Sequence, residues 1–233
     1  MDSLPHGDLA VVIGASGAIG GALMQALQRT GCFANVVGFG RATTPALDLL
    51  DEASIAGCAA WLREMGAPRL VIVATGILHL QDIAPEKSMR QLDPVAMARL
   101  FSVNTIGPAI VMKHFLPLLP RDGKAVLAVL SARVGSIGDN HLGGWFSYRA
   151  SKAAVNQLVR TAAVELGRRQ RHAICVALHP GTVDSALSAP FSKTGLEVQS
   201  PSIAAARILA VIDQLAVADS GEFLDQHGKR VPW

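Results

Sequence analysis

The sequence predicts a single α/β domain covering residues 1–233, a doubly wound parallel sheet with helices on both faces. Short runs rich in β-branched residues alternate along the chain with longer stretches rich in Ala and Leu, which is the pattern of repeated strand–helix–strand units. Half of the residues are apolar and only 17% are charged, so a chain of this length can bury one continuous core. No linker, repeat or low-complexity segment interrupts the pattern.

The first half of the chain supplies three of the expected strands and two of the helices. The runs LAVVIG, NVVGF and RLVIVAT are short, apolar and rich in Val and Ile, as strands buried on both faces of a sheet are. The Ala- and Leu-rich stretches beside them are long enough for helices. We expect strands at 9–14, 35–39 and 69–75 and helices at 18–30 and 51–65.

The second half repeats the alternation and begins with a long helix. We expect that helix at 94–119, bent at Pro108, because proline lacks a backbone donor and its ring collides with the preceding turn. The runs KAVLAVLS and AICVALH have the composition of buried strands. The remaining expected elements are strands at 124–131, 173–179 and 221–225 and helices at 148–167 and 200–215.

The composition argues against nucleic-acid-binding and metal-dependent proteins. The net charge is +3 and the pI is near 9, but acidic and basic residues are interspersed along the chain. The one dense basic run, RRQRH at 168–172, follows an expected helix, where cations stabilise the negative end of the dipole. Cys32, Cys58 and Cys175 lie far apart, and the seven histidines show no ligand spacing. We therefore expect neither a disulfide framework nor a metal site.

No targeting or membrane segment is expected. The amino-terminal stretch carries Asp2 and Asp8 and lacks the basic region of a secretory signal. The apolar run around 70–80 is too short to span a bilayer. We therefore expect a soluble, cytoplasmic protein.

The turn after the first expected strand has the sequence GASGAIGG. Gly14, Gly17 and Gly20 allow the backbone to turn tightly and to approach a pyrophosphate, which the free N–H groups of the next helix would hold. A tight turn can also need glycine for steric reasons alone. Because this turn follows the first strand of an alternating chain, we expect a dinucleotide site.

The end of the second expected strand indicates which dinucleotide binds. An NAD site has Asp or Glu about twenty residues beyond the glycines, where the acid holds the ribose 2′-hydroxyl. This chain has GFGRAT at that place, with Arg41 and no acid. Since an arginine can bind a 2′-phosphate through its planar, charged donors, we expect NADP(H) in preference to NAD(H). The alternative is a surface arginine in a loop.

Tyr148 is the only tyrosine of the chain and lies four residues before Lys152, in the segment YRASK. On a helix this spacing places a phenol and an ammonium group on the same face, one turn apart. A phenol beside a cation can donate a proton to a carbonyl oxygen that gains negative charge during reduction. For the pair taken alone, an exposed tyrosine and a solvated lysine are the alternative.

Six segments appear in the order of one known family: GASGAIG, LDLLD, VATG, VNTIG, YRASK and HPGTVDS. They cover nearly the whole chain, which resembles the short-chain dehydrogenases/reductases, a family with a Rossmann-like fold. The run SARVGSIGDNHLGGWFSYRASKAAVN is most similar to the branch of C-factor-like proteins and small carbonyl reductases. The resemblance implies a homodimer or homotetramer. Apolar residues all around the helices at 94–119 and 148–167 favour the same assembly.

The resemblance also implies the site residues. The catalytic set would be Asn104, Ser131, Tyr148 and Lys152. The cofactor-binding set would be Gly14, Ser16, Gly17, Ile19, Gly20, Arg41, Asp48, Leu49, Ala74, Thr75, Gly76, Tyr148, Lys152, Pro180, Gly181 and Val183. Within this set, Asp48 and Leu49 would lie near the adenine. Pro180, Gly181 and Val183 would line the nicotinamide pocket.

The chain departs from the family pattern at three places. Ala18 stands where the glycine loop usually has Gly, and VATG replaces the usual NNAG, with Ala74 and Thr75 in place of an Asn–Ala pair. Neither of these changes removes a backbone contact to the cofactor. The third departure is Ser131–Ala132, where the family usually has two serines, and the alanine occupies the position expected for the catalytic hydroxyl.

Two outcomes are open at this third departure, because neighbouring strand residues point to opposite faces of a sheet. If the strand has ended, loop geometry can still aim the Ser131 hydroxyl at the substrate, and we favour this outcome. Otherwise Tyr148 stabilises the substrate oxygen alone or with help from Ser136 or Asn140.

The expected activity is that of a metal-independent, NADPH-dependent carbonyl reductase or alcohol dehydrogenase. Lys152 would lower the pKa of the Tyr148 phenol by about one to three units, and Asn104 would hold a water that relays protons. The main alternative is a non-catalytic NADP(H)-binding sensor or signalling protein of the same fold. A sugar-nucleotide epimerase is disfavoured, because only a short region follows HPG.

The segments 78–94, 138–147 and 184–199 are expected to enclose the substrate, a small-molecule carbonyl or alcohol. Their apolar and aromatic residues suggest an apolar pocket. These residues are His141, Trp145, Phe146, Leu187 and Phe191.

Overall fold

A parallel sheet of six strands forms the centre of the structure, a computed structural model that describes residues 1–79, 84–189 and 197–233. The strands lie in the order β2-β1-β3-β4-β5-β8. They are β1 (Leu9–Ile13), β2 (Asn35–Phe39), β3 (Pro68–Val73), β4 (Ala125–Leu130), β5 (Ala173–Leu178) and β8 (Phe223–Leu224). The parallel sheet predicted from the alternation is therefore confirmed.

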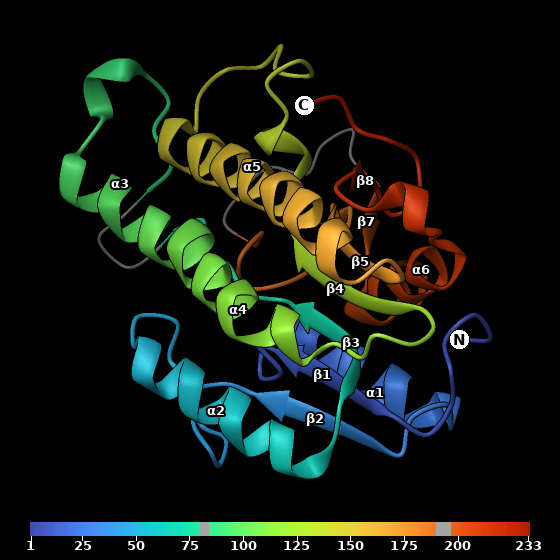
Figure 1. The fold of residues 1–233 in the computed structure, drawn as a ribbon. Helices are drawn as coiled ribbons and strands as arrows, with labels where there is room; N and C mark the ends of the chain where they lie inside the picture. Colours follow the sequence, from blue (N-terminus) through green and yellow to red (C-terminus); the bar gives the residue numbers. More distant parts are fainter. Residues whose placement is uncertain (80–83, 190–196) are drawn as a thin grey trace.

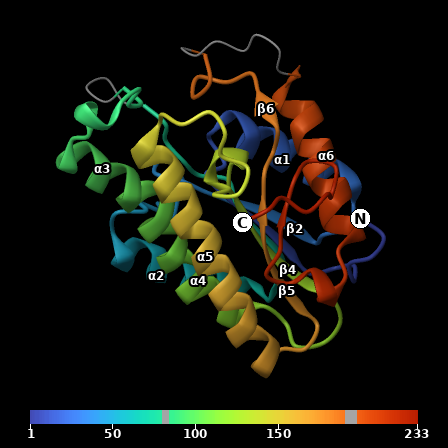
Figure 2. The ribbon, with the colours of Figure 1, turned by 90° about the horizontal axis from the view of Figure 1, so that it is seen from above.

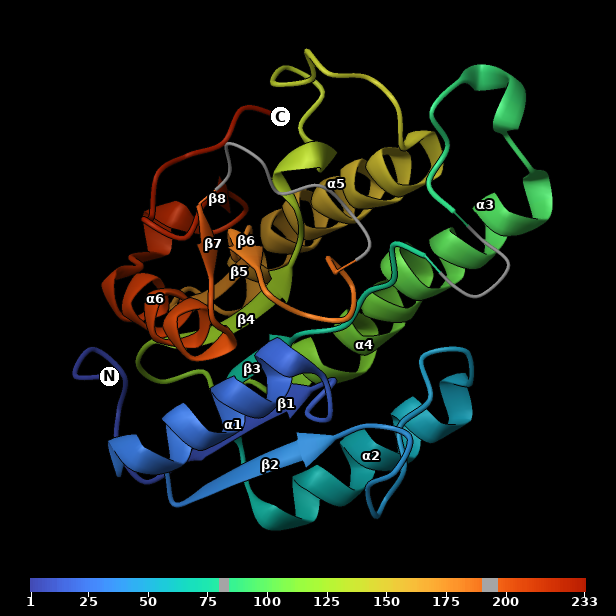
Figure 3. The same ribbon diagram turned by 180° about the vertical axis from the view of Figure 1, so that it is seen from behind.

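Helices cover both faces of this sheet (Figures 1, 2 and 3). On one face lie α1 (Ala18–Thr30) and α6 (Pro201–Gln214). On the other lie α2 (Glu52–Met65), α3 (Pro94–Phe101), α4 (Gly107–Phe115) and α5 (Phe146–Arg169). Figure 2 shows the two helix layers with the sheet between them.

The strand residues alternate between two hydrophobic clusters. In β1, Val11 and Ile13 pack into the cluster under α2, α4 and α5, whereas Ala10 and Val12 pack into the cluster under α1 and α6. Every residue of β1, β3, β4 and β5 is buried. This two-sided burial explains why these strands appear in the sequence as continuous apolar runs.

The long helix expected at 94–119 is interrupted by a π turn at Ser102–Ile106, between α3 and α4, and ends in a 3₁₀ turn at Leu116–Leu118. The helix is thus irregular just before Pro108, where the sequence predicted a bend. Pro108 cannot donate to the carbonyl of Asn104, four residues before it, and its ring must avoid that carbonyl. The π turn buries Asn104 and Thr105 against α5.

Two smaller features were not predicted. A pair of short parallel strands, β6 (Thr182–Val183) and β7 (Val198–Gln199), lies outside the main sheet. The helix expected from Tyr148 begins two residues earlier, at Phe146.

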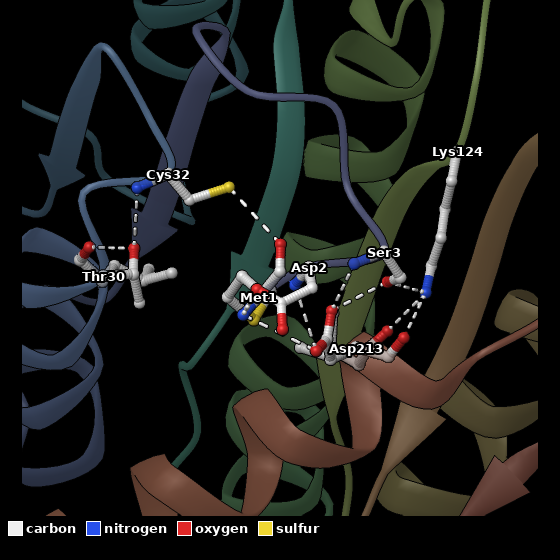
Figure 4. Close-up of polar contacts among 9 residues, drawn as sticks. Met1, Asp2, Ser3, Thr30, Cys32, Lys124 and Asp213 are labelled. Atoms are coloured by element: carbon white, nitrogen blue, oxygen red, sulfur yellow. Dashed lines mark hydrogen bonds and ion pairs between the residues drawn. The ribbon is translucent and has the colours of Figure 1, made fainter.

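The amino-terminal segment is tied to the end of α6 (Figure 4). Asp213 accepts hydrogen bonds from the backbone N–H and the hydroxyl of Ser3. Lys124, which precedes β4, donates to the Ser3 hydroxyl and to the last carbonyls of α6, those of Ile212 and Asp213. Burial lowers the pKa of Lys124. A lysine from a neighbouring loop thus closes the carboxyl end of this helix.

Within the described residues, the helical stretch Pro94–Leu118 is long and apolar enough to cross a membrane by length and composition alone. Core helices of globular domains meet the same criterion, and this stretch packs against α2, α5 and the sheet. Only 39% of the most apolar 18-residue segment in this stretch is buried. Part of its apolar surface therefore remains uncovered in the single chain.

Candidate functional site

A cavity of about 980 Å³ lies beyond the carboxyl ends of β1, β3, β4 and β5. The four turns that follow these strands form one wall, and α5 forms another. Of the residues expected in the site, the cavity is lined by Gly17, Ile19, Ala74, Thr75, Gly76, Ser131, Tyr148, Lys152, Pro180, Gly181 and Val183. The sheet thus brings together residues that are widely separated in the sequence.

The glycine turn lies at the floor of this cavity, between β1 and α1. Gly14 has a φ of +90°, and a Cβ there would come within 2.9 Å of the Ala74 carbonyl oxygen. A Cβ on Gly20 would overlap the carbonyl oxygen of Gly14. Gly17 is the N-cap of α1 and provides no side-chain acceptor for the first N–H groups of the helix. These N–H groups are therefore available to bind an anion.

The residues expected near the adenine and its ribose lie in the loop after β2 and do not line this cavity. Arg41 is exposed at the start of the loop. A Cβ on its neighbour Gly40 would lie 3.6 Å from the Ser16 hydroxyl, so this loop begins beside the glycine turn. Asp48 accepts from the backbone N–H of Leu50 within its own turn, at 2.9 Å. Leu49 packs against Gly107 of α4.

Tyr148 and Lys152 lie one turn apart on α5, and both line the cavity. Tyr148 is 7% exposed and Lys152 is 4% exposed. The Lys152 Nζ lies 6.0 Å from the centroid of the Tyr148 ring and donates to the carbonyl oxygen of Leu130, 3.1 Å away. The phenol and the ammonium group are therefore neighbours in a dehydrated wall of the cavity.

This burial decides the protonation of both groups. Burial raises the pKa of Tyr148 above its ordinary value, and it lowers the pKa of Lys152 to about 8. The pKa of Tyr148 is thus raised and not lowered as expected, because removing a group from water disfavours its charged form. At neutral pH the pair holds both of its protons.

Asn104 lies in the π turn, and its side chain does not line the cavity. Its Oδ1 accepts from the backbone N–H of Ile77 at 2.8 Å, and its Nδ2 donates to the Ile77 carbonyl and the Ser151 hydroxyl. A Cβ on Gly76 would come within 3.4 Å of Asn104 Oδ1. The amide therefore fastens the turn after β3 to the helix that carries Tyr148.

Ser131 is the first residue after β4, which ends at Leu130. Its side chain is buried, lines the cavity, and has no hydrogen-bond partner among the described residues. Ala132 also lines the cavity and packs in a small apolar cluster with Tyr148 and Leu187. The strand has thus ended before Ser131, which is the first of the two outcomes that the sequence left open.

The sequence analysis missed several lining residues, among them Arg149 and His179. Arg149, inside the YRASK segment, donates to the carbonyls of Gly143, Gly144 and Val134. His179, inside the HPG segment, has a buried Nδ1 with no partner in the described part of the chain. Burial lowers the pKa of His179 to about 4. Both residues lie in segments that the sequence analysis quoted, so their position beside the expected residues was an available signal.

The end of the cavity beside Tyr148 is apolar, as expected. The rings of Trp145 and Tyr148 meet edge to face, with centroids 6.2 Å apart and planes at 69°. Leu78 and Leu187 complete this end. His141 and Phe146 do not line the cavity. Phe191 lies outside the described residues.

The cavity fits a dinucleotide. Its glycine turn leaves no room for side chains, and its wall holds three buried polar atoms without partners among the described residues: Thr75 Oγ1, Ser131 Oγ and His179 Nδ1. Buried polar atoms of this kind are normally satisfied by a ligand or water. Among residues 1–79, 84–189 and 197–233, no group of three or more His, Cys, Asp or Glu side chains is arranged to hold a metal ion.

The comparisons with known proteins agree with this geometry. The family model described as short chain dehydrogenase matches residues 40–195. The C-signal of Myxococcus xanthus is 36% identical over 153 residues, which cover 63% of this chain and 84% of that protein. The 1-hydroxy-2-glutathionyl-2-methyl-3-butene dehydrogenase of Rhodococcus sp. strain AD45 is 30% identical over 201 residues, 86% of this chain and 84% of that one.

Among solved structures, the NADPH-bound carbonyl reductase from chicken fatty liver has a similar fold. The TM-score is 0.83 at 27% sequence identity, and the alignment covers 98% of this chain and 95% of the chicken chain.

Proposed function

Because the chain belongs to the short-chain dehydrogenase/reductase family, we propose that this oxidoreductase reduces carbonyl compounds with NADPH, or oxidises the corresponding alcohols. The observation that carries the proposal is the buried Tyr148–Lys152 pair in a cavity whose floor is the glycine turn. A proton donor and an anion-binding helix start face the same space. This is what reduction of a carbonyl group by a dinucleotide requires.

NADPH, when bound, supplies a hydride to the carbonyl carbon. Tyr148 donates its phenolic proton to the carbonyl oxygen, and solvent later returns a proton to Tyr148. Because burial raises its pKa, Tyr148 is in the acid form needed for reduction at neutral pH. The Lys152 ammonium then stabilises the phenolate that remains, since opposite charges attract strongly in a dehydrated site. Ser131 donates a second hydrogen bond to the same oxygen.

The first N–H groups of α1 would hold the pyrophosphate of the cofactor. Arg41 would bind the 2′-phosphate, which would give the preference for NADPH. Thr75 and the segment 180–183 would contact the nicotinamide half. The similarity to an NADPH-bound carbonyl reductase supports NADPH as the cofactor.

The substrate is a small to medium carbonyl compound with an apolar body. Leu78, Leu187 and the Trp145 ring border the space beside Tyr148. Burial of an apolar substrate against these side chains would contribute about 25 cal/mol for each Å² removed from water.

The test is NADPH oxidation across a panel of aldehydes, ketones and quinones, measured for the wild type and for Tyr148→Phe. We expect turnover by the wild type, loss of most of it in Tyr148→Phe, and unchanged NADPH binding in the variant. Wild-type rates in Tyr148→Phe would overturn the assignment of the proton donor.

One observation favours a second candidate function. The relative of Myxococcus xanthus carries the name C-signal. A cofactor-binding signalling protein of this fold would bind NADPH and oxidise it with no member of the panel. The same experiment therefore separates the two functions.

We also propose a homodimer or homotetramer that joins through α4 and α5, and a cytoplasmic location. The partly uncovered apolar surface of Pro94–Leu118 supports the assembly. The free, buried state of all three cysteines fits a reducing compartment.

A further inference from the structure

Glu86 is a buried acidic residue that touches the start of α5 from a distant part of the chain. Glu86 is only 7% exposed to solvent. Its Oε2 accepts from the backbone N–H of Ser147 at 3.2 Å, and its Oε1 accepts a short hydrogen bond from the Ser147 hydroxyl. The backbone carbonyl of Glu86 accepts from the N–H of Trp145 at 2.5 Å. Three hydrogen bonds thus join Glu86 to two residues just before Tyr148.

These contacts replace a cap that the helix itself lacks. The N-cap position of α5 is Trp145, whose side chain makes no capping hydrogen bond. The first N–H groups of any helix need acceptors, and a carboxylate near them is stabilised by the positive end of the helix dipole. Glu86 supplies that carboxylate to a helix of 24 residues. The start of α5 is therefore set by a residue 61 positions away.

The same contacts hold a strained residue. Trp145 has φ 53° and ψ 41°, the left-handed region that bulky side chains rarely adopt. Such conformations persist only where surrounding contacts enforce them, and they gather at functional sites. Here the Glu86 carbonyl accepts from the Trp145 N–H, and Arg149 donates to the carbonyls of Gly143 and Gly144, the two residues before Trp145.

The conformation of Trp145 has a direct consequence for the cavity. Both Trp145 and Tyr148 line it, and their rings meet edge to face. Ser147, whose backbone N–H and hydroxyl both donate to Glu86, immediately precedes Tyr148. Small displacements of reacting groups lower turnover strongly, because proton transfer depends on a narrow range of distances.

We propose that Glu86 is a positioning residue, which fixes the phenol of Tyr148 and the ring of Trp145 against the substrate by capping α5 from outside. This inference rests on the proposed function. Glu86 touches neither the reacting atoms nor the cofactor. It acts through Ser147 and Trp145, and its removal should lower turnover more than it lowers cofactor binding.

The test compares Glu86→Ala, Glu86→Gln and Ser147→Ala with Asp93→Ala, in steady-state kinetics and thermal unfolding. Asp93 is the matched control, because its carboxylate caps the neighbouring helix α3 through the N–H of Ala96 and lines no part of the cavity. We expect Glu86→Ala to lower kcat at least tenfold with KM for NADPH within twofold. Asp93→Ala should lower the unfolding temperature and leave kcat unchanged.

The conservative variant is informative because a glutamine keeps one acceptor oxygen for the Ser147 N–H, and its amide can donate to the Ser147 hydroxyl. We therefore expect Glu86→Gln to recover most of kcat. Should Glu86→Ala fail to fold, Ser147→Ala takes its place, with an expected severalfold loss of kcat. A wild-type kcat in whichever of these two variants folds would overturn the proposal.

A second readout does not depend on turnover. With Trp61→Phe and Trp233→Phe as background, Trp145 is the only tryptophan left of the three. Glu86→Ala in this background should shift the emission to longer wavelength and increase quenching by acrylamide, while Asp93→Ala should change neither. Unchanged emission in Glu86→Ala would contradict the positioning role. If the wild type oxidises no NADPH, the proposed function fails, and this readout still decides whether Glu86 holds Trp145.

Discussion

The ammonium group of Lys152 donates to the carbonyl oxygen of Leu130, 3.1 Å away at the end of β4. This contact holds the cation in the cavity wall, beside the Tyr148 ring and away from bulk water. A lysine in such a place is easier to deprotonate than a solvated one, because burial disfavours its charge. The position of Lys152 therefore has a consequence for the pH dependence of the reaction.

Carbonyl reduction should weaken above about pH 8. The pKa of Lys152 is lowered to about 8, so its charge is present at pH 7 and lost progressively as the pH rises toward 9. Tyr148, whose pKa is raised, keeps its proton over this range. We expect kcat/KM for the carbonyl substrate to fall on the alkaline side with an apparent pKa near 8.

Lys152→Met should be slow at every pH and should lack this alkaline limb. Lys113→Met is the control, because Lys113 is exposed and pairs with Glu52 on the surface. If kcat/KM of the wild type stayed constant up to pH 9.5, the proposed role of the charge on Lys152 would be refuted.

NADPH should bind at least tenfold more tightly than NADH, a difference of about 1.4 kcal/mol. The reason is the exposed Arg41 at the end of β2, where an NAD site would have an acid. Titration by intrinsic fluorescence measures both affinities. Arg41→Ala should abolish the preference, and Arg63→Ala, in α2, should keep it. Equal affinities in the wild type would remove Arg41 from the site.

The assembly proposed for α4 and α5 should be sensitive to single charges on its apolar face. Ile106 and Val164 are 54% and 50% exposed in the single chain, on the π turn and α5 respectively. We expect a dimer or tetramer by light scattering at micromolar concentration, and a monomer for Val164→Asp. Ile203→Asp, on the opposite face in α6, should leave the assembly intact. A monomeric wild type would contradict the proposal.

The lysine that closes α6 should contribute measurably to stability. Lys124→Met removes the side-chain donor to the carbonyls of Ile212 and Asp213, of which the Ile212 carbonyl keeps the backbone N–H of Leu215. Such losses typically cost about 1–3 kcal/mol. Urea denaturation would measure the change. Lys113→Met, which removes only an exposed ion pair, should have little effect. Equal midpoints for the two variants would show that the cap at α6 is unimportant.

The sequence predicted the fold well because the strands are buried on both faces and therefore apolar throughout, as Val71 to Val73 illustrate. Gly14, in the turn after β1, was also predictable, because the spacing of the glycines there reflects local steric needs. Gly76 was expected only from the resemblance to the family. The pKa of Tyr148 was not predictable, because spacing along a helix gives proximity to Lys152 but says nothing about dehydration. The start of α5 depends on Glu86, which lies too far away in sequence for any local pattern to reveal.

The last prediction concerns the hydroxyl that assists Tyr148. Ser131 follows the end of β4, lines the cavity, and has a buried hydroxyl without a partner among the described residues. Neither of the two other candidates lines the cavity. The Ser136 hydroxyl accepts from the N–H of Asp139, and the Asn140 side chain accepts from the N–H of Gly143. The geometry therefore leaves Ser131 as the donor available to the substrate oxygen.

A hydrogen-bond donor to a developing oxyanion is typically worth about a hundredfold or more in turnover. We expect Ser131→Ala to lower kcat at least tenfold, with unchanged unfolding and NADPH binding. The double variant Ser131→Ala/Ala132→Ser moves the hydroxyl to the position usual in the family, where Ala132 already packs near Tyr148, and it should regain part of kcat. Wild-type turnover in Ser131→Ala would show that Tyr148 stabilises the substrate oxygen alone. A double variant slower than Ser131→Ala would show that the alanine at position 132 is needed for substrate to fit.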